Sequence, residues 1–160
     1  MFYQSIENAI AICSEHVSSL DSTNMKDKEL ETYLVAGLVV LIVSEYEDHL
    51  ESLFVKRAEQ CGDAHATNYI KKTLSQSFRS PDLSKIHETL YRFDTSYKNS
   101  FMGAVENSPE SAAWDSLLKA RHAVVHKKGN LNLTFGELKE KYPLTKQIIA
   151  NVEATLGVSS

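Results

Sequence analysis

The sequence contains little glycine, proline or cysteine, and these shortages narrow the range of folds. Its 160 residues include only six glycines and three prolines, so few positions suit tight turns and a fold of many short strands is disfavoured. The two cysteines, Cys13 and Cys61, lie far apart and form no Cys-x-x-Cys pair. We therefore expect reduced thiols, a cytoplasmic location, and one domain stabilised by its apolar core alone.

A long apolar run and an excess of positive charge are also lacking. The strongest apolar run covers residues 33–43, far short of the roughly 20 residues that a membrane span needs, and the N-terminus does not have the pattern of a signal peptide. We expect no membrane association. The formal net charge is −4, whereas proteins that wrap nucleic acid are usually basic. Any contact with nucleic acid must therefore be local.

Apolar residues recur at steps of three and four along most of the chain, which predicts helices. The expected helices cover residues 2–20, about 26–60, 64–77, about 81–93, about 95–105 and 109–126, followed by a last helix from about 134 to 156. The spacing predicts an all-α fold, an antiparallel up-and-down helical bundle with added short helices. We expect a single domain over residues 1–160, with a core at about 26–129 and a C-terminal helical extension at about 134–156.

Several helix starts have local signals. Ser80 followed by Pro81 predicts a capped start with proline in the first helical position, and Ser108 with Pro109 repeats the pattern. Thr134 and Glu137 form a capping box. Pro143 is expected to break the last helix before it resumes. Gly37, inside the long second helix, predicts a close approach of another helix.

The most informative segment is the stretch of ten residues from Ala120 to Gly129, which reads Ala-Arg-His-Ala-Val-Val-His-Lys-Lys-Gly. His122 and His126 are four residues apart and share a helical face, and the long side chain of Arg121 can reach the same patch. Imidazoles transfer protons near neutral pH, and a guanidinium binds phosphate through its fork of donors. Val124 and Val125 are expected to hold this helix to the core.

Two other interpretations of this segment remain open. The spacing of His122 and His126 also suits two zinc ligands on one helical face, but no nearby cysteine or carboxylate supplies a third ligand, so we expect no metal site. The bare spacing of an arginine and a histidine can also arise by chance. In that case the chain is a plain helical interaction domain.

The arrangement resembles the HEPN domains, which are small all-helical bundles. Arg121, the polar His122 and His126 match the signature of that family late in a core helix, and residues 115–120 and 127–129 are similar to its usual surroundings. Residues 33–50 are similar to its long second helix, and residues 83–101 to the middle helices of one bacterial branch. The similarity covers roughly residues 29–129.

The resemblance implies an endoribonuclease that needs no metal or other cofactor, commonly a toxin or an antiviral defence effector. Its partners would be RNA, a second copy bound through the helix of Arg121 and His126, and an antitoxin or other defence-system protein. Some HEPN domains have lost catalysis and bind RNA or assemble proteins instead. That inactive role is the main alternative.

Candidate site residues follow from the chemistry and the resemblance. His126 would be the general base or acid, Arg121 would stabilise the charge on phosphorus, and His122 would assist proton transfer or hydrogen-bond RNA. Glu47 matches the glutamate of the family's second helix and is a candidate to orient Arg121 or His126, with Glu45 as its rival. The flanking phosphates would be bound by Lys127 and Lys128.

Overall fold

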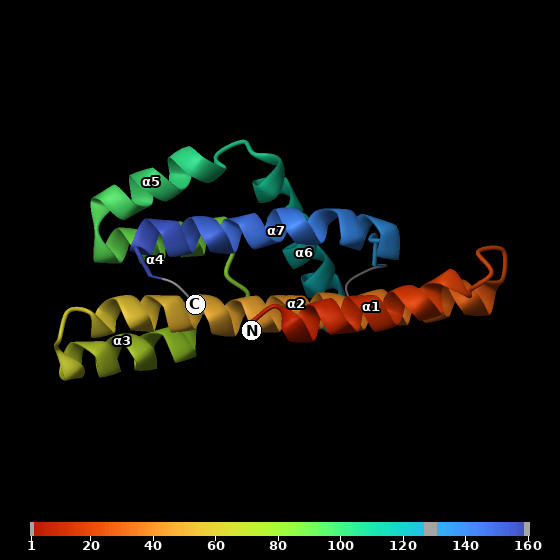
Figure 1. The fold of residues 1–160 in the computed structure, drawn as a ribbon, viewed down its shortest axis with the longest axis horizontal. Coiled ribbons are helices and arrows are strands. Elements are labelled where there is room, and N and C mark those ends of the chain that lie inside the picture. Colours follow the sequence, from red (N-terminus) through yellow and green to blue (C-terminus); the bar gives the residue numbers. More distant parts are fainter. Residues whose placement is uncertain (1, 127–130, 159–160) are drawn as a thin grey trace.

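The computed structural model describes residues 2–126 and 131–158, which form seven helices and no strand (Figure 1). The helices are α1 (Gln4–Ser18), α2 (Met25–Glu59), α3 (Ala64–Ser77), α4 (Leu83–Phe93), α5 (Thr95–Val105), α6 (Pro109–His126) and α7 (Phe135–Leu156). The all-α prediction is confirmed. Across the described ranges, no helix has both the length and the apolar character needed to cross a membrane.

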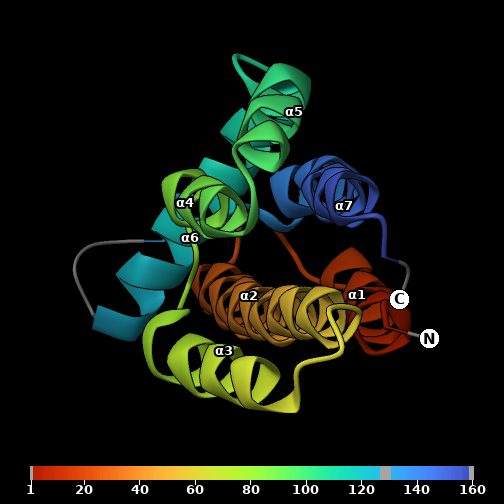
Figure 2. The same ribbon diagram turned by 90° about the vertical axis from the view of Figure 1, so that its left-hand side faces the viewer.

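The long helix α2 organises the fold. Figure 1 shows α1 lying along its N-terminal half and α3 folding back along its C-terminal end. In Figure 2, which looks nearly along α2, these three helices form one layer, and α4, α5 and α7 lie above them. Helix α6 runs from the upper layer to the lower one and packs against both α2 and α7. The helix with the arginine–histidine motif therefore bridges the two layers.

The core is one cluster of buried apolar side chains shared by both layers. Tyr46, Leu50, Leu53 and Phe54 form the predicted apolar stripe on α2, and all four are buried. Helix α7, expected as an extension, adds eight buried residues, most of them apolar, on the side that faces this cluster. Burial of this kind, at about 25 cal/mol per Å² of apolar surface, is the main force that holds the layers together.

Most helix starts are set by local capping, and the capping box predicted at Thr134 is confirmed. Asn24 accepts a hydrogen bond from the amide of Lys26 at the start of α2. Asp94 caps α5 through the amide of Ser96. Thr134 forms the complete capping box of α7. These side chains satisfy amides that have no partner within the helix, which fixes where each helix begins.

The start of α4 differs from the prediction. Asp82, not Ser80, is the N-cap, and its carboxylate accepts a hydrogen bond from the amide of Lys85. Ser80 instead has a φ of 42°, in the left-handed region. The prediction was wrong because distant residues hold the segment between α3 and α4. We call this segment, residues 78–82, the connector.

Two further expectations about helix interiors were wrong. Helix α7 continues through Pro143 without a break, because buried residues on both sides of the proline, including Tyr142 and Thr145, anchor it to the core. Gly37 has no neighbouring atom of the described chain within 4 Å of where a Cβ would lie. The glycine therefore serves no close helix contact within the described chain, and it lies on an exposed side of α2.

Candidate functional site

The motif helix α6 is anchored by its first half rather than its last turn. Ala113, Trp114, Leu117 and Ala120 are buried. Val125, expected to face the core, is 47% exposed. Val124, expected to do the same, is half-buried, so the prediction failed only for Val125. Helix α6 leaves the core after Ala120, and its last turn projects from the molecule. This exposure leaves His122 and His126 accessible from solvent, whereas Arg121 is half-buried.

The two motif histidines lie in contact on this exposed turn. The ring centroids of His122 and His126 are 4.3 Å apart, with the ring planes at 48°. This contact is the outcome expected for residues four apart on a helix. Both side chains are exposed, so they can exchange protons with a bound molecule or with water.

A surface groove of about 450 Å³ runs beside the motif. One wall consists of residues of α6, namely Asp115, Leu118, Lys119, Arg121, His122 and Ala123. The opposite wall belongs to the connector and consists of Ser80 and Asp82. We call this cavity the motif groove. It brings together two segments that are about 40 residues apart in the sequence.

Two polar atoms that belong to residues of the motif groove are buried without a hydrogen-bond partner in the described chain. They are Oγ of Ser80 and Nε of Arg121. Buried donors are almost always paired in folded proteins, and an unpaired one costs about 1–3 kcal/mol. The left-handed backbone of Ser80 adds about 1 kcal/mol or more for a residue with a Cβ. Two separate costs therefore fall on Ser80.

Glu47 holds the connector in this conformation through two hydrogen bonds. Its carboxylate is 8% exposed and accepts hydrogen bonds from the Nη1 of Arg79 and from the backbone amide of Ser80, both at 2.7 Å. The sequence suggested that Glu47 orients Arg121 or His126. In the structure, both of its carboxylate oxygens go to the connector instead. Glu45, the rival, is half-buried on α2.

A second attachment fixes the connector to the motif helix. The indole Nε1 of Trp114 donates a hydrogen bond to the backbone oxygen of Pro81 at 3.0 Å, and this contact is buried. The indole also stacks on Tyr46 of α2, with ring centroids 5.4 Å apart and planes at 10°. Helices α2 and α6 thus hold the connector from two sides.

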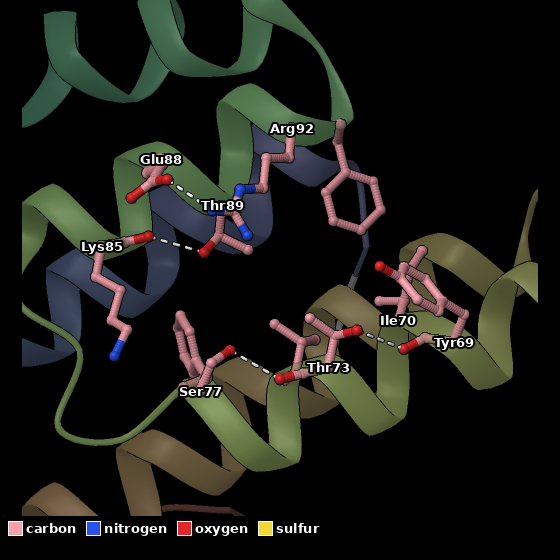
Figure 3. A pocket seen from close by; sticks show the side chains of 11 residues that line it. Tyr69, Ile70, Thr73, Ser77, Lys85, Glu88, Thr89 and Arg92 are labelled. Atoms are coloured by element: carbon pink, nitrogen blue, oxygen red, sulfur yellow. Dashed lines mark hydrogen bonds and ion pairs between the residues drawn. The ribbon is translucent and has the colours of Figure 1, made fainter.

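A different cavity, of about 370 Å³, lies between α3 and α4 (Figure 3). The hydroxyl groups of Thr73 and Thr89 already donate hydrogen bonds within their own helices, each to the backbone oxygen four residues earlier. Arg92 is paired with Glu88 at 2.7 Å. This cavity is more apolar than the motif groove and contains no histidine, so it lacks a convergent set of proton-transfer groups.

Sequence reasoning found Arg121 and His122 in the motif groove but missed the rest of its lining. Asp115 and Lys119 lie seven and three residues before His122, so helical spacing could have placed them on the same face. No local pattern could have placed Ser80 there, because its position depends on Glu47, 33 residues away. The predicted phosphate-binding residues Lys127 and Lys128 lie outside the described residues.

No group of three or more histidine, cysteine and carboxylate side chains in the described chain is arranged to hold a metal ion. Comparison with known proteins gave one finding that covers nearly the whole chain. The family model described as RiboL-PSP-HEPN matches residues 2–157. Neither a curated protein nor a solved structure matches the chain. The family match includes α1 and α7, which the sequence resemblance did not cover.

Proposed function

The chain belongs to the RiboL-PSP-HEPN family, and from this premise we propose that it is a metal-independent endoribonuclease. The observation that supports the proposal most strongly is the exposed contact between His122 and His126 beside a groove lined by Arg121. Proton-transfer groups and a phosphate-binding cation thus meet at one accessible place.

RNA supplies its own nucleophile, which limits what the protein must do. The 2′-hydroxyl next to the scissile phosphate attacks phosphorus once its proton is removed, and the departing 5′-oxygen has to be protonated. In the proposed mechanism His126 takes or gives one of these protons, because imidazole transfers protons readily near neutral pH. Arg121 binds the phosphate oxygens and stabilises the charge that develops on them.

The contact between the two histidines argues that the second proton-transfer group comes from another chain. A base and an acid must lie on opposite sides of the reacting phosphate, each within about 2.6–3.2 Å of its oxygen. Rings with centroids 4.3 Å apart leave no room for a phosphate between them. In the proposed mechanism, His122 and His126 therefore lie on the same side of the reacting phosphate. A second copy, bound through α6, would supply the other side in a composite site.

The alternative is a catalytically inactive HEPN module that binds RNA or assembles proteins, and the negative groups in the motif groove favour the assembly role. Asp82 and Asp115 line the groove together with Lys119 and Arg121, so the formal charge there is balanced. An acidic groove side repels phosphate and lowers the affinity for RNA. The carboxylate of Asp82 is occupied by the amide of Lys85, which leaves Asp115 as the main opposing charge.

Cleavage of a fluorescent single-stranded RNA tests the proposal. We expect His126→Ala to lower kcat by about 10²–10⁴-fold, which is the usual contribution of a general acid or base. Arg121→Ala should lower kcat by about 10²–10³-fold. His65→Ala is the matched control, because His65 is also exposed but lies in the first turn of α3. Equal cleavage by wild type and His126→Ala would contradict the assignment.

The biological setting follows from the same proposal. An RNA-cleaving protein of this family would act in the cytoplasm as a toxin or a phage-defence effector, restrained by an antitoxin or by another component of the system. Expression of wild type in bacteria should slow growth, whereas His126→Ala should not. Growth arrest by both variants would favour the inactive module acting through binding.

A further inference from the structure

Ser80 carries two energetic costs that the start of α4 does not require. Its backbone is left-handed and its hydroxyl oxygen is buried without a partner in the described chain. The start of α4 does not need it, because Asp82 is the N-cap. Strain that the surrounding structure imposes on one residue is a feature of functional sites, so the position of Ser80 calls for a functional explanation.

The surrounding structure does impose this conformation. The amide of Ser80 donates to the buried carboxylate of Glu47 at 2.7 Å, and the next residue, Pro81, accepts a hydrogen bond from Trp114 at 3.0 Å. One attachment comes from α2 and the other from α6. The connector therefore cannot relax without losing a buried hydrogen bond to one of these helices.

The conformation places Ser80 in the lining of the motif groove, to which Arg121 also belongs. The Oγ of Ser80 and the Nε of Arg121 are both donors without a partner in the described chain. A phosphate oxygen accepts hydrogen bonds from a hydroxyl and from a guanidinium at once, so one phosphate group could satisfy both once the two side chains, whose donor atoms are buried here, turn into the groove. A rotation about the Cα–Cβ bond of Ser80 would turn its hydroxyl towards the groove without moving the backbone.

We propose that Ser80 binds a phosphate of the RNA substrate together with Arg121, and that Glu47 and Trp114 are positioning residues that act through the connector. This inference rests on the proposed function. It gives Glu47 a role that needs no contact with Arg121 or His126. It also makes the motif groove a binding site built from two walls of one chain, separate from the side that a second copy would supply.

The variant Ser80→Gly separates a functional role from a structural one. Glycine adopts a positive φ at no steric cost and leaves no hydroxyl unpaired, so the thermal midpoint should rise by about 2–4 °C. Loss of a hydrogen bond to the phosphate that Arg121 also binds should lower kcat/KM about tenfold. A purely structural serine would not combine a gain in stability with weaker substrate binding.

Asn107→Gly is the matched control. Asn107 is the other described residue besides glycine with a positive φ, at 57°, and it lies between α5 and α6 rather than in the motif groove. We expect its kcat/KM to equal that of wild type. If Ser80→Gly and Asn107→Gly have the same kcat/KM as wild type while all three cleave RNA, Ser80 does not bind the substrate and only this inference fails.

If wild type does not cleave RNA, the inference is tested by binding. Anisotropy of a fluorescent single-stranded RNA then measures the Kd of each variant. A roughly tenfold higher Kd for Ser80→Gly than for Asn107→Gly would support the phosphate contact in an inactive module. Equal Kd values would overturn the contact. If wild type neither cleaves nor binds RNA, the inference and the proposed function both fail.

Discussion

Glu47 is buried on α2, and its carboxylate connects the long helix to a connector more than 30 residues further along the chain. Arg79, its charged partner, is 65% exposed, so much of the attraction between the two charges is screened by water. The bond to the amide of Ser80 is the more important of the two for position. At the residue scale, Glu47 matters because it fixes a backbone conformation rather than because it carries a charge.

His49 gives the molecule a pH-dependent stability that is separate from the site. It is buried, stacks on Phe2 with ring centroids 3.7 Å apart, and lies 3.2 Å from a carboxylate oxygen of Glu153. Burial lowers the pKa of His49 below its ordinary 6.5, and Glu153 only partly opposes this. Burial also lowers the pKa of His87. Both histidines bind protons more readily when the chain is unfolded.

Stability should therefore be complete above about pH 6.5 and fall as the pH is lowered below that value. The urea midpoint at pH 5.5 should be lower than at pH 7.5, and the difference should shrink in His49→Gln. The exposed His65 provides the control variant, His65→Gln, which should keep the wild-type difference. A midpoint that rises on acidification would show that the burial of His49 and His87 does not govern this pH range.

At the scale of single elements, α7 tolerates a proline that should weaken it. Pro143 is exposed, whereas Tyr142 and Thr145 beside it are buried, and Thr145 is hydrogen-bonded to the hydroxyl of Tyr46 at 2.9 Å. Tertiary contacts thus maintain a helix that lacks one backbone hydrogen bond.

Pro143→Ala should stabilise the protein by about 1–3 kcal/mol, because it restores that hydrogen bond and removes no buried surface. Urea unfolding measures the change. Gln147→Ala, at an exposed position one turn later, should change the free energy of unfolding by less than about 0.5 kcal/mol. An unchanged or lower stability for Pro143→Ala would mean that the proline fixes a bend that the core requires.

The elements show which features a sequence can predict. Thr134 and Glu137 interact within one helical turn, so their sequence alone located the start of α7. The contact of His122 with His126 was predictable for the same reason. The left-handed Ser80 was not, since it depends on Glu47 and Trp114. The exposure of Val125 depends on where α6 leaves the core, which periodicity does not reveal.

At the scale of the whole molecule, the proposed composite site requires a second copy next to α6. Val125, one residue before His126, presents an apolar side chain that is 47% exposed. A second copy bound through α6 would remove this apolar surface from water, which is favourable.

Val125→Asp should therefore produce a monomer in sedimentation velocity and lose RNA cleavage, with little change in thermal stability. Cleavage should return as the protein concentration is raised, because mass action restores the dimer. Ala112→Asp introduces the same charge at an exposed position in the first turn of α6 and should remain dimeric. A fully active monomer would contradict the composite site.

The most direct test of the central claim is the chemical nature of the RNA ends that wild type produces in EDTA. Attack by the 2′-hydroxyl leaves a 2′,3′-cyclic phosphate on one fragment and a 5′-hydroxyl on the other. We predict that wild type and His65→Ala produce these ends and that His126→Ala does not. Fragments with a 5′-phosphate and a 3′-hydroxyl, or cleavage that stops in EDTA, would contradict the proposed mechanism.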